Sequence, residues 1–269
     1  GVNATVESMR NVASVGATPH ALTDCLCFGN PEKPEQMWEF VESTRGISDT
    51  CKTVTLKEHP NSPTPIIAGN VSFYNESKFG AIPPSPIVSC LGKIKNIDNA
   101  ITMSFKKENS LILMIGKRKN ELGGSLYYDL FDKLGANVPK PDLNTVKGEI
   151  FSLTTCIDKK LILSCHDISD GGLSAALAEM TFENNIGCSV NYKTILKPEA
   201  FLFSETGGFI LEIDSSYLKE VEKEFLINNI EIAVIGKTNK SKMIEINEEI
   251  SINLIDVKSS WETGLREKL

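Results

Sequence analysis

This sequence of 269 residues lacks three features that would assign it quickly to a class of protein. It has no GxxxxGK[ST] P-loop, so any ATP must be held by another arrangement of groups. It has neither an apolar run long enough to cross a membrane nor a basic-then-apolar leader. It also has no excess of positive charge, because the formal net charge is -7. A nucleic-acid groove needs a basic face. We therefore expect no membrane and no nucleic-acid partner.

The cysteines show no disulfide framework. There are 7 of them, an odd number at irregular spacings, and several lie in apolar strand-like runs such as residues 161–165. Buried free cysteines of this kind are typical of a reducing compartment and predict a cytoplasmic location. Cys25 and Cys27 are the one close pair, but no CxxC, second cysteine pair or histidine pair completes a zinc site.

Hydrophobic residues make up 41% and charged residues 23%, which is ordinary for a globular protein with a real core. The pattern predicts an α+β fold, or a layered sheet with helices on one face, divided near 106–108 into parts 1–106 and 107–269. The expected helices span 2–15, 35–51, 125–134, 148–158, 173–183 and 216–226. The expected strands span 21–23, 65–67, 87–94, 111–115, 161–165, 209–213 and 232–235, with two more within 243–254.

Residues 68–76 (AGNVSFYNE) follow a short apolar strand and turn polar within one residue. Gly69 allows close approach of backbone to a ligand. Asn70, Ser72, Asn75 and Glu76 then offer amide, hydroxyl and carboxylate groups in one span. Such oxygen-rich segments suit Mg²⁺ and the phosphates it carries, although an ordinary strand-to-loop turn explains the pattern equally well.

Residues 166–172 (HDISDGG) join an expected strand to an expected helix. Ser169 or Asp170 can cap that helix, and Gly171 and Gly172 would leave backbone N–H groups free at its positive end as an anion pocket. The carboxylates there favour a phosphate that arrives with Mg²⁺, or ribose hydroxyls. A capped turn without a ligand is the simpler alternative, and His166 is either a general base or a structural residue with its partners satisfied.

Two other polar segments have plainer interpretations. The turn 203–208 contains Glu205, which could reach a ligand, but a simple turn is the default. The short basic run 117–119 is expected to be a solvated loop after a strand.

Residues 22–34 (LTDCLCFGNPEKP), 69–76 (GNVSFYNE) and 166–173 (HDISDGGL) together resemble phosphoribosylformylglycinamidine synthase, a family of purine-pathway enzymes. The first two motifs are specific to that family. The third is shared with aminoimidazole ribonucleotide synthetase, selenophosphate synthetase and thiamine-monophosphate kinase. The resemblance covers nearly the whole chain, including 261–263, and matches the second half of the family's synthetase subunit.

The resemblance implies an aminoimidazole ribonucleotide synthetase-like fold. Residues 1–106 would form an A-type domain, a half-barrel sheet with helices that lacks its first strands, and residues 107–269 a complete B-type α/β sandwich domain. The opening residue Gly1, where a complete protein would have Met, agrees with a cut or processed piece.

Position by position, the resemblance puts Asp24 and Gly69 on ATP, Asn70 on Mg²⁺ and Ser72 on formylglycinamide ribonucleotide. The family's catalytic histidines belong to the first half, so no catalytic residue is expected here and the isolated chain should be inactive. The implied partners are that first half, a glutaminase subunit and a small accessory subunit. Three positions depart from the family pattern: Cys27 replaces an asparagine, Phe209 replaces an arginine, and the loop 57–64 is longer than usual.

Two alternatives to this ligase remain. One is another enzyme of the superfamily, such as a selenophosphate synthetase relative, although its N-terminal Gly-rich or Lys/Cys-bearing loop is missing. The other is a non-catalytic nucleotide-binding or assembly module that completes a partner's site. An incomplete sheet with an open edge also predicts self-association.

Overall fold

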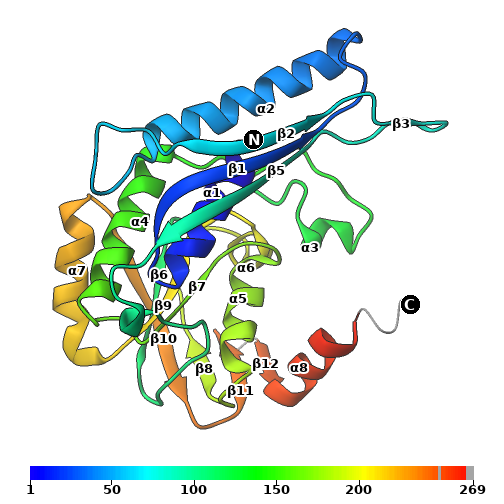
Figure 1. Cartoon of the computed structure of the whole chain (residues 1–269). Coiled ribbons are helices and arrows are strands. Elements are labelled where there is room, and N and C mark those ends of the chain that lie inside the picture. The colour runs from blue at the N-terminus through cyan, green and yellow to red at the C-terminus, as the bar shows by residue number, and fades with distance from the viewer. Residues whose placement is uncertain (248–249, 265–269) are drawn as a thin grey trace.

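The computed structural model describes residues 1–247 and 250–264 of the chain, which fold around two main sheets (Figure 1). The first part contains α1 (Val2–Ser14), β1 (Thr18–Cys27), α2 (Pro34–Thr53), β2 (Ile66–Ser72), β3 (Glu76–Ser77), β4 (Gly80–Ala81) and β5 (Ser85–Lys93). The second part contains β6 (Leu111–Ile115), α3 (Leu126–Asp129), α4 (Leu143–Asp158), β7 (Ser164–Asp167), α5 (Gly172–Thr181), β8 (Gly187–Val190), α6 (Pro198–Phe203), β9 (Phe209–Ile213), α7 (Leu218–Ile227), β10 (Ile232–Asn239), β11 (Met243–Ile246), β12 (Ile250–Asn253) and α8 (Leu254–Thr263). Short 3-10 turns lie at Ile97–Asn99 and Ser215–Tyr217.

The smaller sheet has the order β2-β1-β5, with β1 parallel to β2 and antiparallel to β5. α2 runs along this sheet (Figure 1), and α1 packs against both β5 and α2. The pair β1 and β2 places the carboxyl ends of two strands side by side. That edge carries the residues that the sequence predicts to bind ligands.

The larger sheet has the order β12-β11-β8-β10-β6-β9-β7. Helices pack on both of its faces, so the alternative of a layered sheet with helices on one face is wrong for this sheet. β6 shows how it is buried on both faces: Leu111, Leu113 and Ile115 join the cluster that contains α4 and α7. Ile112 and Met114 join the cluster that contains α5 and α6. A strand buried on both faces needs a continuous apolar run, and LILMI supplies it.

One apolar cluster joins the two parts of the chain, because it contains Val6 and Leu22 together with Ile150 and Phe209. Lys57 adds a polar link across the same junction. Its Nζ donates to the Phe151 carbonyl at 2.9 Å and to the hydroxyls of Thr154 and Thr155 at 2.7 Å each. Burial lowers the pKa of Lys57 to about 8. The proposed boundary near 106–108 therefore separates two sheets that share one core.

Most predicted elements are present, but their ends differ. The strands predicted at 21–23 and 65–67 extend to Cys27 and Ser72, so the predicted ligand residues lie within strands. The helix predicted at 125–134 is wrong beyond Asp129, since Asp132 adopts a left-handed φ of 53° that ends the turn. The strand predicted at 161–165 is displaced to Ser164–Asp167, after a left-handed residue at Lys160.

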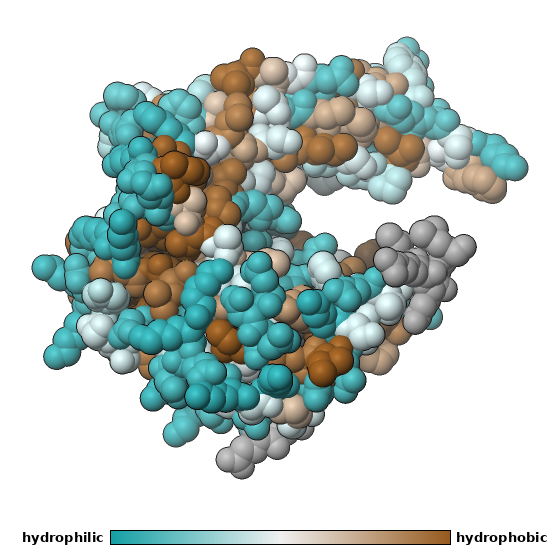
Figure 2. Space-filling model, turned by 60° about the horizontal axis from the view of Figure 1, so that its bottom comes forward, coloured by the Kyte–Doolittle hydropathy of each residue, from teal (hydrophilic) through white to brown (hydrophobic). Residues whose placement is uncertain are grey.

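The smaller sheet leaves several large apolar side chains exposed, among them Ile67 (59%), Ile87 (57%) and Leu91 (53%). Figure 2 shows apolar side chains on this part of the molecule, next to a hollow in its surface. Exposed apolar surface of this kind agrees with the predicted self-association, which stays a prediction. Within the described residues, no helix has the length and apolarity that crossing a membrane requires.

Candidate functional site

The strand register brings the four predicted ligand residues together. In the parallel pair of β1 and β2, Asp24 lies opposite Gly69, Cys25 opposite Asn70 and Cys27 opposite Ser72. We call this group (Asp24, Gly69, Asn70 and Ser72) the strand-edge site. Although Asp24 is far from the other three in the sequence, all four occupy neighbouring positions on two paired strands.

Gly69 leaves space for the side chain of its neighbour Asp24. A Cβ at this position would lie 2.6 Å from Asp24 Oδ1, closer than such contacts normally allow. The glycine therefore makes room for the Asp24 carboxylate directly across the strand pair. This contact gives a structural reason why the two residues occur together.

The polar groups after Gly69 are held by a local network. The Ser72 hydroxyl donates a hydrogen bond to Asn75 Oδ1 at 3.1 Å. Asn75 Nδ2 donates to the carbonyls of Phe28 and Ser72 at 2.9 Å each. Tyr74 sits at a left-handed φ of 59°, which turns the chain here. Asn75 is thus a structural residue that fixes the end of β2, whereas Asn70 is exposed.

The same network ties together the first two sequence motifs. The Tyr74 and Asn75 backbone N–H groups donate to the carbonyls of Gly29 and Phe28. Lys33 Nζ also lies 2.6 Å from Glu76 Oε1. Segments 28–34 and 69–76 therefore form one structural unit next to the strand-edge site.

The donors present at this site fit Mg²⁺ only as part of a nucleotide complex. Asn70 Nδ2 faces Cys25 Sγ at 3.7 Å, and among the described residues no hydrogen bond to the Asn70 amide oxygen is found. In those residues there is also no group of three or more His, Cys, Asp or Glu that could hold a metal. Mg²⁺ commonly takes one or two protein oxygens and completes its shell with phosphate and water, which this donor set allows.

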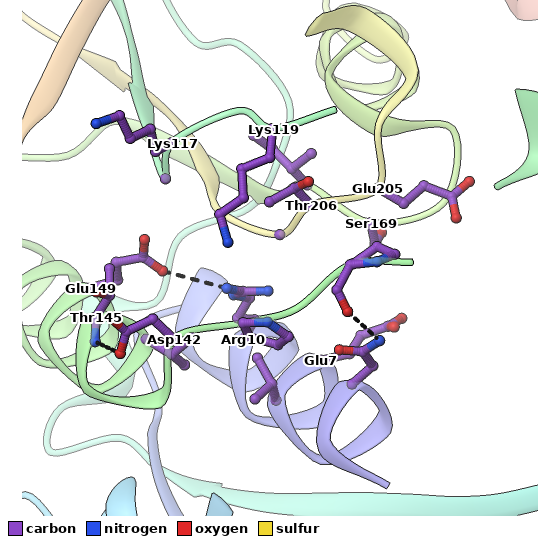
Figure 3. A pocket seen from close by; sticks show the side chains of 18 of the residues that line it. Glu7, Arg10, Lys117, Lys119, Asp142, Thr145, Glu149, Ser169, Glu205 and Thr206 are labelled. Carbon is purple, nitrogen blue, oxygen red and sulfur yellow. Dashed lines mark hydrogen bonds and ion pairs between the residues drawn. The ribbon is translucent and has the colours of Figure 1, made fainter. Parts of the chain in front are cut away.

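A cavity of about 730 Å³ lies between α1 and the larger sheet (Figure 3). Glu7 and Arg10 line it from α1, and Asp142 and Glu149 line it from α4. Asp167 lines it from the end of β7. The loops that follow β6, β7 and α6 contribute Lys117, Lys119, Ser169, Asp170, Glu205 and Thr206. We call it the interdomain cavity. Its walls are charged with both signs.

Arg10 and Glu149 form the buried part of this wall. Their atoms Nη2 and Oε2 lie 3.5 Å apart, and the side chains are 10% and 3% exposed. Burial raises the pKa of Glu149, although Arg10 lowers it. Arg10 Nε, Glu149 Oε2 and two nitrogens of nearby Arg118 have no hydrogen-bond partner. Burial and the charge of Arg10 lower the pKa of Arg118 to about 10.

At the predicted anion pocket, formed by Asp170, Gly171 and Gly172, acceptors of the chain itself already bind the glycine N–H groups. Glu205 Oε1 accepts from the Gly171 N–H at 3.0 Å, and the Gly172 N–H donates to the Ser169 carbonyl. The expectation of free N–H groups is therefore wrong, because the Glu205 carboxylate accepts from one of them and the Ser169 carbonyl accepts from the other. The expected cap is also wrong: Gly171 is the N-cap of α5 at φ 73°, without a side-chain hydrogen bond.

His166 is a structural residue. Its Nε2 lies 2.7 Å from Glu179 Oε2 and its Nδ1 lies 3.2 Å from Asp167 Oδ1. Burial lowers its pKa, but both carboxylates raise it more, to about 9. Two carboxylate partners on the ring nitrogens and a raised pKa favour the structural alternative over the general base.

The sequence patterns did not predict several residues of the interdomain cavity. Arg10 and Glu149 look like ordinary polar positions of amphipathic helices, and no local motif marks them. The basic run 117–119 was expected to be solvated, but Arg118 is buried at 6% exposure and donates to the Ser204 carbonyl. The one available signal was Glu205, whose turn precedes a strand in a polar setting.

Comparisons with known proteins agree with this architecture. The family description "AIR synthase related protein, C-terminal domain" matches residues 107–247, and "AIR synthase related protein, N-terminal domain" matches residues 1–94. The chain is 38% identical to phosphoribosylformylglycinamidine synthase subunit PurL of Methanothrix thermoacetophila, a match that covers 100% of this chain and 36% of that protein. The PurL of Thermococcus sibiricus is 37% identical, over 97% of this chain and 36% of its own length.

Solved structures show the same fold at low sequence identity. T. maritima PurL complexed with FGAR has a TM-score of 0.75 and 13% identity, over 95% of this chain and 42% of that one. E. coli HypE, a hydrogenase maturation protein, has a TM-score of 0.70 and 16% identity, in a match that covers 94% of this chain and 78% of HypE. The expected aminoimidazole ribonucleotide synthetase-like fold is confirmed. The chain spans about a third of the curated PurL relatives, and it belongs to the AIR synthase related protein family.

Proposed function

We propose that this chain is part of an ATP-dependent ligase of purine biosynthesis, phosphoribosylformylglycinamidine synthase, and that its strand-edge site binds ATP and substrate. The main support is the 38% identity to a PurL subunit along the entire chain. The strand register adds to this, because it groups Asp24, Gly69, Asn70 and Ser72 at one edge. Solved PurL structures described as complexes with ATP and with FGAR share the fold.

In the proposed reaction, ATP phosphorylates the formamide oxygen of formylglycinamide ribonucleotide. Ammonia released from glutamine then attacks the activated carbon and displaces phosphate, which leaves the amidine, ADP and inorganic phosphate. Mg²⁺ would neutralise the charge of the transferred phosphoryl group. The chain's own residues bind and orient the reactants, and the catalytic histidines are expected elsewhere in the complete protein.

Each residue of the strand-edge site has a proposed role that suits its surroundings. Asp24 accepts hydrogen bonds from ATP, and Gly69 keeps the space beside its carboxylate open. Asn70 would offer its amide oxygen to Mg²⁺, and Ser72 would offer its hydroxyl to the substrate. The proposed partners are the remainder of the synthetase polypeptide, a glutaminase subunit that supplies ammonia and a small accessory subunit. A solved structure described as PurLQS from Thermotoga maritima shares this fold.

Substitution of Asn70 in the complete protein tests the proposal. Asn70→Ala should abolish Mg²⁺-dependent turnover, measured as formation of ADP and the amidine product. Asn61→Ala, at an exposed asparagine of the loop before β2, is the control and should leave turnover unchanged. Full activity of Asn70→Ala would reject the assigned role of the strand-edge site.

A non-catalytic nucleotide-binding or assembly module is the second candidate. It is favoured by the engaged state of His166, whose two ring nitrogens both face carboxylates. The two candidates differ in one measurement on the complete protein. If it binds ATP and its partner subunits but releases no ADP with substrate and ammonia present, the module is the correct description.

A further inference from the structure

Two thiols of the smaller sheet lie side by side on one strand. Cys25 and Cys27 are both half-buried on β1, and their Sγ atoms are 3.9 Å apart. Cys51, Cys156, Cys165 and Cys188 are instead buried. No sequence motif marks the pair as a metal site. We propose that Cys25 and Cys27 form a two-thiolate binding site for a soft d10 cation such as Zn²⁺ or Cd²⁺.

The spacing of the sulfur atoms suits a bridging ion better than a disulfide. With Zn–S bonds of about 2.3 Å and tetrahedral angles, two thiolates on one ion lie roughly 3.8 Å apart. A disulfide needs about 2.05 Å between sulfurs and Cα atoms about 4.4–6.8 Å apart. Alternate residues of an extended strand are separated by about 6.6 Å, the upper end of that range. The observed 3.9 Å therefore holds the thiols near the separation that a shared ion requires.

Asn70 supplies a third donor. It lies directly opposite Cys25 on β2, and its amide Nδ2 is 3.7 Å from Cys25 Sγ. Rotation of the amide by about 180° brings its oxygen to the same place, and the two orientations are similar in shape. All three residues stand on paired strands, so no loop has to rearrange. Solvent or a bound ligand would complete the coordination.

The donor set also determines which ion is preferred. Thiolates select soft cations, whereas Mg²⁺ takes oxygen ligands. A site with two thiolates and one amide is open, because a closed structural zinc site uses four protein ligands. We therefore expect reversible occupation by a thiophilic cation, with Mg²⁺ unable to replace it.

Occupation has a consequence for catalysis, and this part rests on the proposed function. Asn70 is the proposed Mg²⁺ ligand, so a soft ion held by Cys25 and Cys27 would take its amide away from Mg²⁺-ATP. Thiophilic cations should then inhibit the complete synthetase. Cation binding itself does not depend on that activity, and the two claims can fail separately.

Titration of the reduced chain with Cd²⁺, without nucleotide, tests the binding. We expect one Cd²⁺ per chain by native mass spectrometry, with an ultraviolet cadmium-thiolate absorption. Cys25→Ser and Cys27→Ser should each weaken binding at least tenfold. Cys90→Ser, at a half-buried thiol of neighbouring β5, is the matched control and should bind as the unchanged chain does. Circular dichroism checks that each variant is folded. Equal binding by the Cys27→Ser and Cys90→Ser variants would overturn the site.

Inhibition is tested in the complete synthetase. Cys27→Asn restores the residue that the related family usually has there, and we expect it to stay active and to become resistant to Cd²⁺. Cd²⁺ could bind the cysteine pair and yet inhibit the unchanged synthetase and the Cys27→Asn variant equally. That result would support the binding site and reject its link to Asn70. If the synthetase shows no ligase activity under any condition, the proposed function fails while the Cd²⁺ titration still decides the site.

Discussion

The strand-edge site and the interdomain cavity are built in opposite ways. The strand-edge site consists of small polar groups on two adjacent strands, and backbone pairing alone brings them together. The cavity consists of charged side chains from α1, α4 and three loops, and Arg10 and Glu149 meet although they are 139 positions apart in the sequence. The first depends on local register, and the second depends on the complete tertiary structure.

This difference predicts different responses to mutation. Changes at the strand-edge site should affect ligand binding and leave folding nearly unchanged, because its residues are exposed or half-buried. Changes in the cavity wall should affect folding first, because buried charges that lose their partners are costly. Four experiments test this contrast.

The largest effect is expected from Arg10→Met. It would leave the buried Glu149 carboxylate without its cation, which typically costs about 3–5 kcal/mol of folding free energy. Urea denaturation measures the loss. Lys117→Met, an exposed cation of the same cavity, is the control and should change stability by no more than about 0.5 kcal/mol. Similar losses in both variants would show that the buried pair is not special.

The second effect concerns pH. The folded pKa of His166, about 9, lies above its ordinary value of 6.5, so its protonated form stabilises the fold. This contribution is complete below pH 6.5 and is lost as pH rises through 9; it is at most roughly 3 kcal/mol. Urea denaturation at pH 6.5 and 9.5 should show a larger loss for the unchanged chain than for His166→Gln. An equal pH dependence in both would contradict the role of Asp167 and Glu179.

The third effect should appear in binding alone. Gly69→Ala would push a Cβ against Asp24 Oδ1, and we expect ATP binding by the complete protein to weaken at least tenfold, about 1.4 kcal/mol. Folding stability should change by less than about 1 kcal/mol, since the position is exposed. Ser89→Ala on β5 of the same sheet is the control. Calorimetric ATP titration and urea denaturation together separate the two quantities.

The smallest effect is expected at the first turn of α4. Asp142 Oδ1 accepts from the Asn144 and Thr145 N–H groups at 3.0 and 3.3 Å. Loss of this cap in Asp142→Ala should cost about 1 kcal/mol, whereas Asp142→Asn keeps an acceptor and should cost less. Thermal unfolding compares the variants. Equal stability of the unchanged chain, Asp142→Ala and Asp142→Asn would mean that the Asp142 cap does not stabilise the fold.

Local patterns in the sequence were enough to predict the α+β class and the strands at 111–115 and 209–213. The strand-edge residues were assigned from the family resemblance; the strand register brings them together, and their ligand roles stay a prediction. Local patterns were not enough for the cavity. Glu205 reaches Gly171 across 34 positions, and Arg118 is buried by contacts with the segment after α6. Such contacts form only when the larger sheet is assembled. The ends of β1 and β2 were also missed, because cross-strand hydrogen bonds extend them through residues of low strand propensity.

The carboxylate of Glu205 on the Gly171 N–H has a consequence for selectivity. A tethered group competes at an effective concentration that starts in the millimolar range for flexible linkers and is higher when the fold holds it in place. Free phosphate or a metabolite carboxylate would have to displace this intramolecular competitor before it could use the α5 N-terminus. We therefore expect a small anion to bind at this turn only if it makes further contacts in the cavity.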